Sequence, residues 1–136
     1  MPITYSISPG DRRINALATG TIRADDLHGL IRSLLADPAL VPGLRALYDA
    51  SNAEPDITVL ELAEIAGEVR ELLKRGLGRI ALVAYSPATY RVAKTFTVLA
   101  QAIGIDVDVF RELSEAEAWL AEDTGITGTD EMMLPR

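Results

Sequence analysis

The sequence predicts a single α/β domain with a mixed, mostly parallel five-stranded sheet and four helices, in the order β-β-α-β-α-β-α-β-α. Three observations predict this class. Apolar residues alternate over short segments, they recur at helical spacing over longer ones, and the two patterns take turns along the chain. Strands that alternate with helices favour a parallel sheet with right-handed crossovers, so we expect only the first strand to run antiparallel.

The chain begins with a predicted hairpin and helix. Residues 3–8 and 13–19 alternate in polarity and flank the turn signal SPGD. From Ala24 the apolar residues Leu27, Leu30, Ile31, Leu34 and Leu35 form one helical stripe. This helix is expected to end at Asp37-Pro38, because a residue that precedes proline avoids the helical conformation.

The third strand is predicted to be short and to end in an aspartate. It covers residues 44–49, LRALYD, and a polar loop is expected after it. Thr58 then opens the second helix, and the spacing to Glu61 predicts a capping box, in which each side chain bonds the other's backbone N–H. Gly76 is placed to end that helix in a left-handed conformation.

The last third of the chain repeats the same alternation. Residues 79–85, RIALVAY, are nearly all apolar, as in central parallel strands. Ser86 followed by proline begins a helix that runs to Ile103, and residues 105–109 form the fifth strand. Ser114 and Glu117 predict a second capping box. We expect residues 1–122 to form the domain and residues 123–136 a flexible C-terminal tail.

Composition excludes several kinds of site and partner. The 136-residue chain has no cysteine and a formal net charge of −7. Disulfides, thiolate metal sites and cysteine nucleophiles are therefore excluded, and an acidic chain is a poor partner for nucleic acid. No signal peptide is recognisable, and no segment reaches the roughly 20 apolar residues of a transmembrane helix. We expect a cytoplasmic protein.

The residues offer no catalytic constellation. His28 is the only histidine, whereas a metal site needs several convergent ligands and serine hydrolysis needs a base. The glycines at 76 and 78 precede a strand, while a dinucleotide-binding fingerprint follows one. We therefore expect no enzyme activity, no metal and no cofactor.

Polar residues near two strand ends form a candidate rim. Asp49 ends the third predicted strand and Ser86 follows the fourth, and carboxyl ends of parallel strands share one edge of a sheet. Ser51 and Asp56 lie in the predicted loop, and Thr58 opens the next helix, where a phosphate is favoured. The alternative is that Thr58 is only a cap, worth about 1 kcal/mol, and the residues alone favour the cap.

The order of elements, the aspartate in LRALYDA and the run RIALVAYSPATYRVAKTFTVLAQAIGIDVDVFRELSEAEAWL resemble the SpoIIAA-like proteins of the STAS superfamily, over about residues 1–121. In anti-sigma-factor antagonists of this superfamily, a kinase phosphorylates the first serine of an Asp-Ser-Ser/Thr-Gly motif. The matching positions are Asp56, Ile57 and Thr58, followed by Val59 in place of glycine. The resemblance therefore implies a candidate phosphoacceptor at Thr58, with Ser51 as a second candidate.

The resemblance also implies an apolar ligand, because SpoIIAA-like proteins resemble the Sec14 lipid-exchange fold. The expected site is an apolar space between the second and third helices and the sheet. Its candidate lining residues are Leu62, Ile65, Val69, Phe96 and Leu99. The alternative is that these side chains pack together and leave no gap.

Two main functional hypotheses follow, and a third, a small enzyme that uses Asp49 and the serines of the rim, lacks the usual nucleophile–base pairing. The leading one is a non-catalytic binding or regulatory module for an apolar, lipid-like small molecule or a protein partner, and it allows a peripheral contact with membranes. The second is a phospho-regulated partner switch of the anti-sigma-factor-antagonist type. Neither hypothesis fixes the oligomeric state, and a homodimer is left open.

Overall fold

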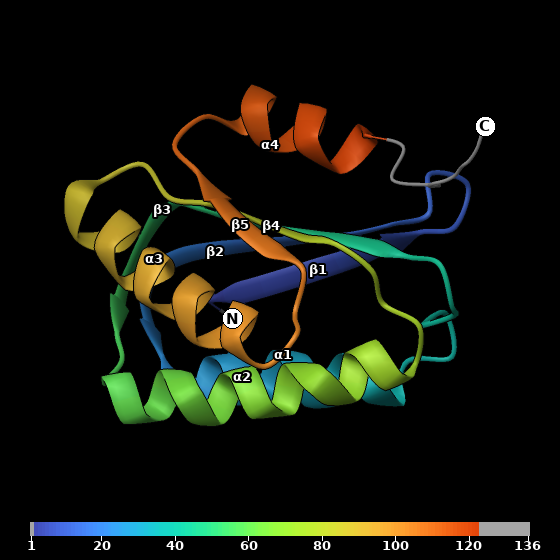
Figure 1. Ribbon diagram of the computed structural model, residues 1–136, viewed down its shortest axis with the longest axis horizontal. Coiled ribbons are helices and arrows are strands. Elements are labelled where there is room, and N and C mark those ends of the chain that lie inside the picture. Colours follow the sequence, from blue (N-terminus) through green and yellow to red (C-terminus); the bar gives the residue numbers. More distant parts are fainter. Residues whose placement is uncertain (1, 123–136) are drawn as a thin grey trace.

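The computed structural model of the protein describes residues 2–122, which form one five-stranded sheet and four helices (Figure 1). The predicted tail, residues 123–136, lies outside the described residues. The predicted fold class and order of elements are confirmed. In chain order the elements are β1 (Ile3–Ser8), β2 (Arg13–Arg23), α1 (Ala24–Ala36), β3 (Arg45–Asp56), α2 (Val59–Lys74), β4 (Ile80–Val83), α3 (Pro87–Ala102), β5 (Val107–Phe110) and α4 (Leu113–Ala121).

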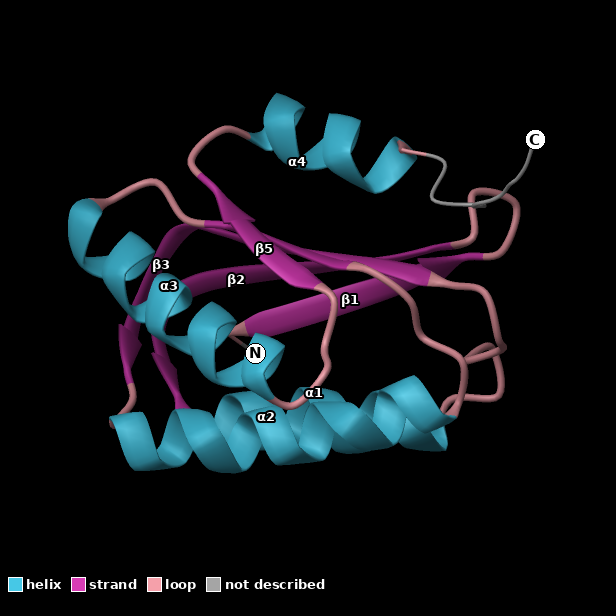
Figure 2. Cartoon of the chain, viewed as in Figure 1, coloured by secondary structure: helices cyan, strands magenta, loops and turns pink. Residues whose placement is uncertain are grey.

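The strands lie side by side in chain order, β1-β2-β3-β4-β5. Only β1 is antiparallel to its neighbour. Right-handed crossovers between successive parallel strands place α1, α2 and α3 on one face of the sheet, and α4 covers the other face (Figure 2). Strand β4 shows the two faces directly, since Leu82 packs in the core under α1–α3 and Val83 packs against α4.

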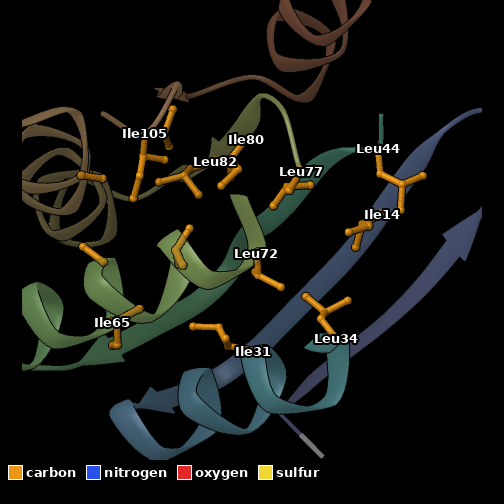
Figure 3. Close-up of a cluster of buried hydrophobic side chains, with 14 of the residues drawn as sticks. Ile14, Ile31, Leu34, Leu44, Ile65, Leu72, Leu77, Ile80, Leu82 and Ile105 are labelled. Atoms are coloured by element: carbon orange, nitrogen blue, oxygen red, sulfur yellow. The ribbon is translucent and has the colours of Figure 1, made fainter. Parts of the chain in front are cut away.

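The main core lies between the sheet and the helices α1–α3. Figure 3 shows Ile31 of α1 and Ile65 and Leu72 of α2 directed toward strand residues such as Ile80 and Leu82. The stripe predicted for α1 packs into this core throughout its length. A second, smaller core under α4 contains Leu47, Ala81, Val83, Ala116 and Leu120.

Strand β3 is longer than its sequence suggests, and the prediction of a loop after Asp49 is wrong. β3 continues to Asp56 because β2 also extends and supplies ladder partners as far as Arg23. The register shifts by one residue just after Asp49, which marks a β-bulge. β4 ends level with Asp49, so the extension has one free edge, and a free edge tolerates Pro55.

Most predicted helix ends are confirmed. Thr58 Oγ1 accepts the Glu61 N–H at 3.2 Å, and Glu61 accepts the Thr58 N–H at 2.9 Å. The Ser86 hydroxyl accepts the Thr89 N–H at 3.2 Å and so caps α3. Gly76 adopts φ +93°, and a Cβ there would lie 2.6 Å from Pro42 Cα. The capping box predicted at Ser114 is wrong, because α4 begins at Leu113 and places Ser114 inside the first turn.

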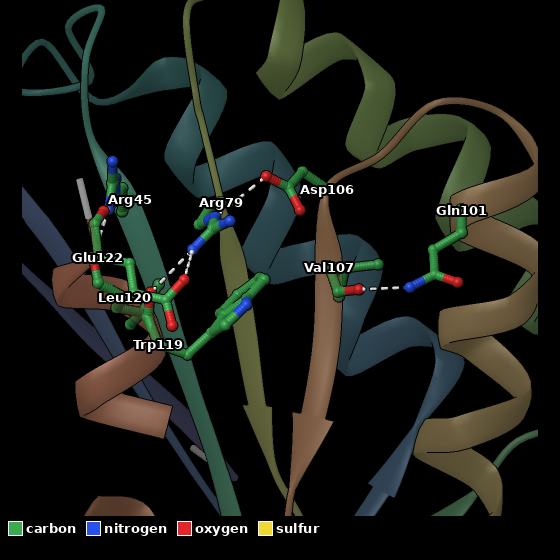
Figure 4. Close-up of polar contacts among 8 residues, drawn as sticks. All are labelled: Arg45, Arg79, Gln101, Asp106, Val107, Trp119, Leu120 and Glu122. Atoms are coloured by element: carbon green, nitrogen blue, oxygen red, sulfur yellow. Dashed lines mark hydrogen bonds and ion pairs between the residues drawn. The ribbon is translucent and has the colours of Figure 1, made fainter. Parts of the chain in front are cut away.

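Two arginines fix the C-terminal end of α4 to the sheet (Figure 4). Arg79 Nη1 donates to the Trp119 carbonyl at 2.9 Å, its Nε pairs with Asp106 at 3.2 Å, and its guanidinium lies over the Trp119 ring. Arg45 donates to the carbonyls of Leu120 and Glu122. Carbonyls at a helix end lack intrahelical partners, so these donors add to the Glu122 backbone N–H, which bonds the Trp119 carbonyl at 3.3 Å.

Candidate functional site: an apolar cavity under the helical layer

An apolar cavity of about 150 Å³ lies between the helices α1–α3 and the sheet. All three helices and the strands β2, β3 and β4 contribute to its walls. The helical walls consist of Leu27, Leu30, Ile31 and Leu34 of α1, Leu62, Ile65, Val69 and Leu72 of α2, and Thr89, Val92, Ala93 and Phe96 of α3. Several of these residues are seen in Figure 3, where the two facing layers of side chains are visible.

The walls carry two side-chain polar groups, the hydroxyls of Thr89 and Tyr48. The Thr89 hydroxyl is already used, because it donates to the Ala53 carbonyl at 2.8 Å on the free edge of β3. The surface that a ligand would meet is therefore almost wholly aliphatic and aromatic. An engineered apolar cavity of comparable size in another protein stays dry and binds benzene. The cavity is thus suited to a small apolar molecule.

The gap arises from small residues on the sheet. Five alanines line the cavity at positions where a larger side chain would fill it: Ala16, Ala46, Ala50, Ala53 and Ala93. Four of them lie on β2 and β3, and Ala93 lies on α3. The hydrophobic stripes of α2 and α3 face this row of small side chains and so cannot close the space completely.

Several wall residues of the cavity are partly exposed. Wall residues near the helix N-termini, such as Leu27, Ile57 and Val92, retain partial exposure, whereas Leu72 and Leu77 at the opposite end are buried. The helix N-termini adjoin the carboxyl ends of the strands, which is where ligands enter open α/β sheets.

The structure brings together four of the five residues predicted to line an apolar space. Leu62, Ile65, Val69 and Phe96 all contribute to the wall. Leu99 is half-buried on α3 and is not among the lining residues. The α1 and strand contributions were missed, because the resemblance placed the space between α2 and α3 only. Ala16 and Ala46, which lie within the predicted strands, were the sequence signal that could have revealed the strand contribution.

The predicted rim residues are dispersed. Asp49 faces the α4 side, where it borders a shallow surface depression together with Leu113 and Glu117 of α4. Asp56 lies seven residues farther along β3, roughly 20 Å away at the strand rise of about 3.3 Å per residue, and pairs with Arg23 at 3.4 Å. Ser86 caps α3. Asp49 and Asp56 therefore do not converge on one site.

Ser51 is held by Asp49 at the β-bulge. The Asp49 carboxylate accepts the Ser51 backbone N–H at 3.0 Å and also accepts the Ser51 hydroxyl. Both hydrogen bonds stabilise the irregular backbone at the point where the register shifts. A phosphate on Ser51 would lie beside this carboxylate, which disfavours it electrostatically.

His28 joins α1 to α2. Its Nδ1 lies 2.8 Å from Glu68 Oε2, and the two groups form an ion pair when the imidazole is protonated, without the alignment of a hydrogen bond. Within residues 2–122, no three His, Asp or Glu side chains are arranged to hold a metal ion.

The sequence matches no protein-family model and no curated protein. A search of solved structures finds an uncharacterized DUF3478-family protein from Shewanella loihica PV-4 that has a SpoIIAA-like fold. It superposes with a TM-score of 0.56 and 18% sequence identity, over 88% of this chain and 94% of that one. The chain has a SpoIIAA-like fold. At this identity the likeness establishes the fold, and function is argued from the chain's own residues.

Thr58 is the N-cap residue of α2. Its side chain is exposed, but both its hydroxyl and its backbone N–H bond Glu61. These hydrogen bonds lower the pKa of the Glu61 carboxyl. Next to Thr58, Val59 and Leu60 are 62% and 72% exposed. Thr58 is thus a functioning cap beside two exposed apolar residues.

None of the four helices in the described part of the chain is long and apolar enough to span a membrane.

Proposed function

We propose that this protein is a non-catalytic binding module that holds a small apolar molecule in the cavity between α1–α3 and the sheet. The observation that carries the proposal is the cavity itself, about 150 Å³ with almost wholly apolar walls. A SpoIIAA-like fold is consistent with a regulatory or partner-binding module. In such a module the bound molecule would act as the signal or the cargo.

The energetics support a ligand in this space. An empty apolar cavity costs about 24 cal/mol per Å³, so a void of this volume costs about 3.6 kcal/mol of stability. Natural cores contain few voids larger than a water molecule. A molecule that fills the space recovers the lost dispersion contacts and is removed from water at the same time.

The test uses toluene as the probe and two matched variants. Ala93→Leu extends a side chain into the cavity, whereas Ala63→Leu makes the same change on the exposed side of α2. In a titration followed by two-dimensional NMR, toluene should shift the methyl signals of Ile65 and Val69 in the wild type and in Ala63→Leu. Ala93→Leu should show no saturable shifts. Equal binding by both variants would place toluene elsewhere and refute the proposal.

A second candidate function is a phospho-regulated partner switch at Thr58. The observation that favours it is the exposed hydroxyl beside the exposed Val59 and Leu60, which form a small apolar contact surface. A phosphate on Thr58 adds about two negative charges at the α2 N-terminus, opposite the Glu61 carboxylate that now bonds this hydroxyl. The expected consequence is loss of the capping box and a change in the adjacent apolar surface.

This candidate has its own test. The protein is isolated from its native cells under phosphatase inhibition, and peptides that contain Thr58 and Ser51 are analysed by mass spectrometry. A phosphate on Thr58 that disappears in the Thr58→Val variant supports the switch. Unmodified peptides in every growth condition argue against it.

A further inference from the structure

The edges of the sheet differ in how their backbone groups are occupied. The outer strands β1 and β5 and the extended end of β3 each have one side without a neighbouring strand. Unpaired N–H and C=O groups along such an edge are a template for pairing with another chain, and proteins usually block them with bulges, prolines or charged side chains. An edge that is left unblocked is therefore a candidate interface.

The free edge of β5 is blocked by side chains. The Asp106 carbonyl accepts a hydrogen bond from β4, so the alternation of a strand directs the backbone groups of Val107 and Val109 outward. Gln101 of α3 donates to the Val107 carbonyl at 2.9 Å (Figure 4). The Asp108 carboxylate accepts the Val109 N–H at 2.8 Å. An incoming strand would have to displace both side chains.

The free edge of β3 is blocked in a similar way. The Asp49 carboxylate occupies the Ser51 N–H at the β-bulge. The Thr89 hydroxyl of α3 donates to the Ala53 carbonyl at 2.8 Å, and Pro55 has no N–H to offer. Another strand therefore finds few free backbone groups here.

The free edge of β1 carries none of these devices. The Thr19 N–H of β2 donates to the Pro2 carbonyl at 2.9 Å. In an antiparallel ladder this bond sets the alternation, so that the backbone groups of Ile3, Tyr5 and Ile7 point away from β2. Among residues 2–122, no hydrogen bond joins these outward groups to a side chain or to another segment. The strand, ITYSIS, contains no charge and no proline, and its register with β2 is unbroken.

The sequence of β1 is also complementary to itself. When two copies of the strand run antiparallel with Tyr5 opposite Tyr5, Ile3 of each chain lies opposite Ile7 of the other. Thr4 then lies opposite Ser6 on the other face of the sheet. Every outward N–H and C=O finds a partner in this register, and the cross-strand pairs join apolar to apolar and hydroxyl to hydroxyl side chains. A two-fold symmetric contact requires a self-complementary surface of this kind.

From the blocked edges of β3 and β5 and the open, self-complementary edge of β1, we infer that two copies of this chain associate through β1. The two sheets join there into one continuous sheet, with Tyr5 opposite Tyr5. β1 contributes no residue to the cavity wall, so this inference is independent of the proposed function.

The first test is sedimentation equilibrium over a concentration series that reaches millimolar protein. The variant Thr4→Lys/Ser6→Lys changes two exposed positions of β1, and in the inferred register it places lysine opposite lysine at both of them. Its matched control, Thr19→Lys/Thr21→Lys, adds the same charges at exposed positions of the inner strand β2. Circular dichroism establishes that both variants are folded.

We expect dimers for the wild type and for the β2 control, and loss of the dimer for the β1 variant. A wild type that is monomeric at every concentration refutes the inference. A folded β1 variant that still dimerises also refutes it, because the interface then lies elsewhere.

The second test fixes the register and does not depend on the lysine variants. The chain has no cysteine, so Thr4→Cys and Ser6→Cys each provide a single thiol. Opposite residues in a non-hydrogen-bonded antiparallel pair have Cα atoms about 4.5 Å apart, within the range that a disulfide spans. Under mild oxidation, an equimolar mixture should form the mixed disulfide faster than either variant forms its own, and intact mass distinguishes the three products. Equal rates for all three would contradict the inferred pairing.

Discussion

Filling the cavity should make the protein more stable while it removes ligand binding. Ala93→Leu adds three carbon atoms at a position on α3 that lines the cavity. Burying three carbons contributes about 2.4 kcal/mol at about 0.8 kcal/mol each, and ordering the leucine costs about 0.5–1 kcal/mol. The net gain is about 1.5 kcal/mol. It is smaller than the roughly 3.6 kcal/mol cost of the whole void, as expected for partial filling.

The assay is equilibrium urea unfolding of the ligand-free proteins, with Ala63→Leu as control. The free energy of unfolding should rise by about 1.5 kcal/mol in Ala93→Leu, with an unchanged m-value. This gain corresponds to about 5 °C in Tm for a chain of this length. Ala63 is exposed on α2, so its variant should stay within about 0.5 kcal/mol of the wild type.

A loss of stability would refute the reasoning. If Ala93→Leu destabilises the protein by 1 kcal/mol or more, the leucine is overpacked, and the space under the helices is already filled by side chains. If Ala93→Leu is stabilised and still binds toluene as tightly as the wild type, toluene binds outside the cavity.

Three further predictions concern the elements that frame the cavity. Thr58→Ala should cost about 1 kcal/mol in the free energy of unfolding at pH 7. The backbone N–H of Thr58, which remains in the variant, and its hydroxyl, which is removed, both lower the pKa of Glu61. The stabilisation from the hydroxyl's bond to the carboxylate is present above the unfolded pKa and lost as pH falls through the folded one, so in urea unfolding the difference between the two proteins should become smaller, without vanishing, below about pH 4.5. A constant difference down to pH 3 would contradict this coupling. Arg79→Met should cost about 1 kcal/mol in the free energy of unfolding, since it removes one hydrogen bond to the Trp119 carbonyl, which keeps the Glu122 N–H as its other donor. It should also shift the fluorescence of the single tryptophan; unchanged emission would mean that α4 is held by other contacts. Gly76→Ala should destabilise by more than 1 kcal/mol because of its positive φ and the nearby proline backbone, whereas Gly67→Ala, in open space within α2, should stabilise by about 0.5–1 kcal/mol in the same assay; equal effects would contradict the assigned backbone geometry.

Local patterns in the sequence predicted the fold because each is a short-range effect. The stripe of α1, the capping box at Thr58 and the left-handed Gly76 depend on neighbours within a few residues, and the structure contains all three. The extension of β3 to Asp56 depends instead on a distant partner, β2. Residues 50–56 contain Asn, Pro and Asp, which are depleted in strands, so local propensity pointed to a loop.

The candidate site was predictable only in part, for a similar reason. Helical periodicity identifies Leu62, Ile65 and Val69 as facing inward, but it does not report whether the opposite wall is large or small. That wall includes Ala50 and Ala53, which lie beyond the predicted end of the strand. Since the predicted strand stopped at Asp49, these alanines could not be assigned to the cavity.

The central claim is that the cavity holds a small molecule in the working protein, and intact mass tests it most directly. The protein is purified from its native cells, and its mass is recorded under native and then denaturing conditions, in parallel with Ala93→Leu. The account predicts an additional mass in the native wild type that disappears on denaturation and is absent from Ala93→Leu. A wild-type chain with the same bare mass in both spectra would contradict it.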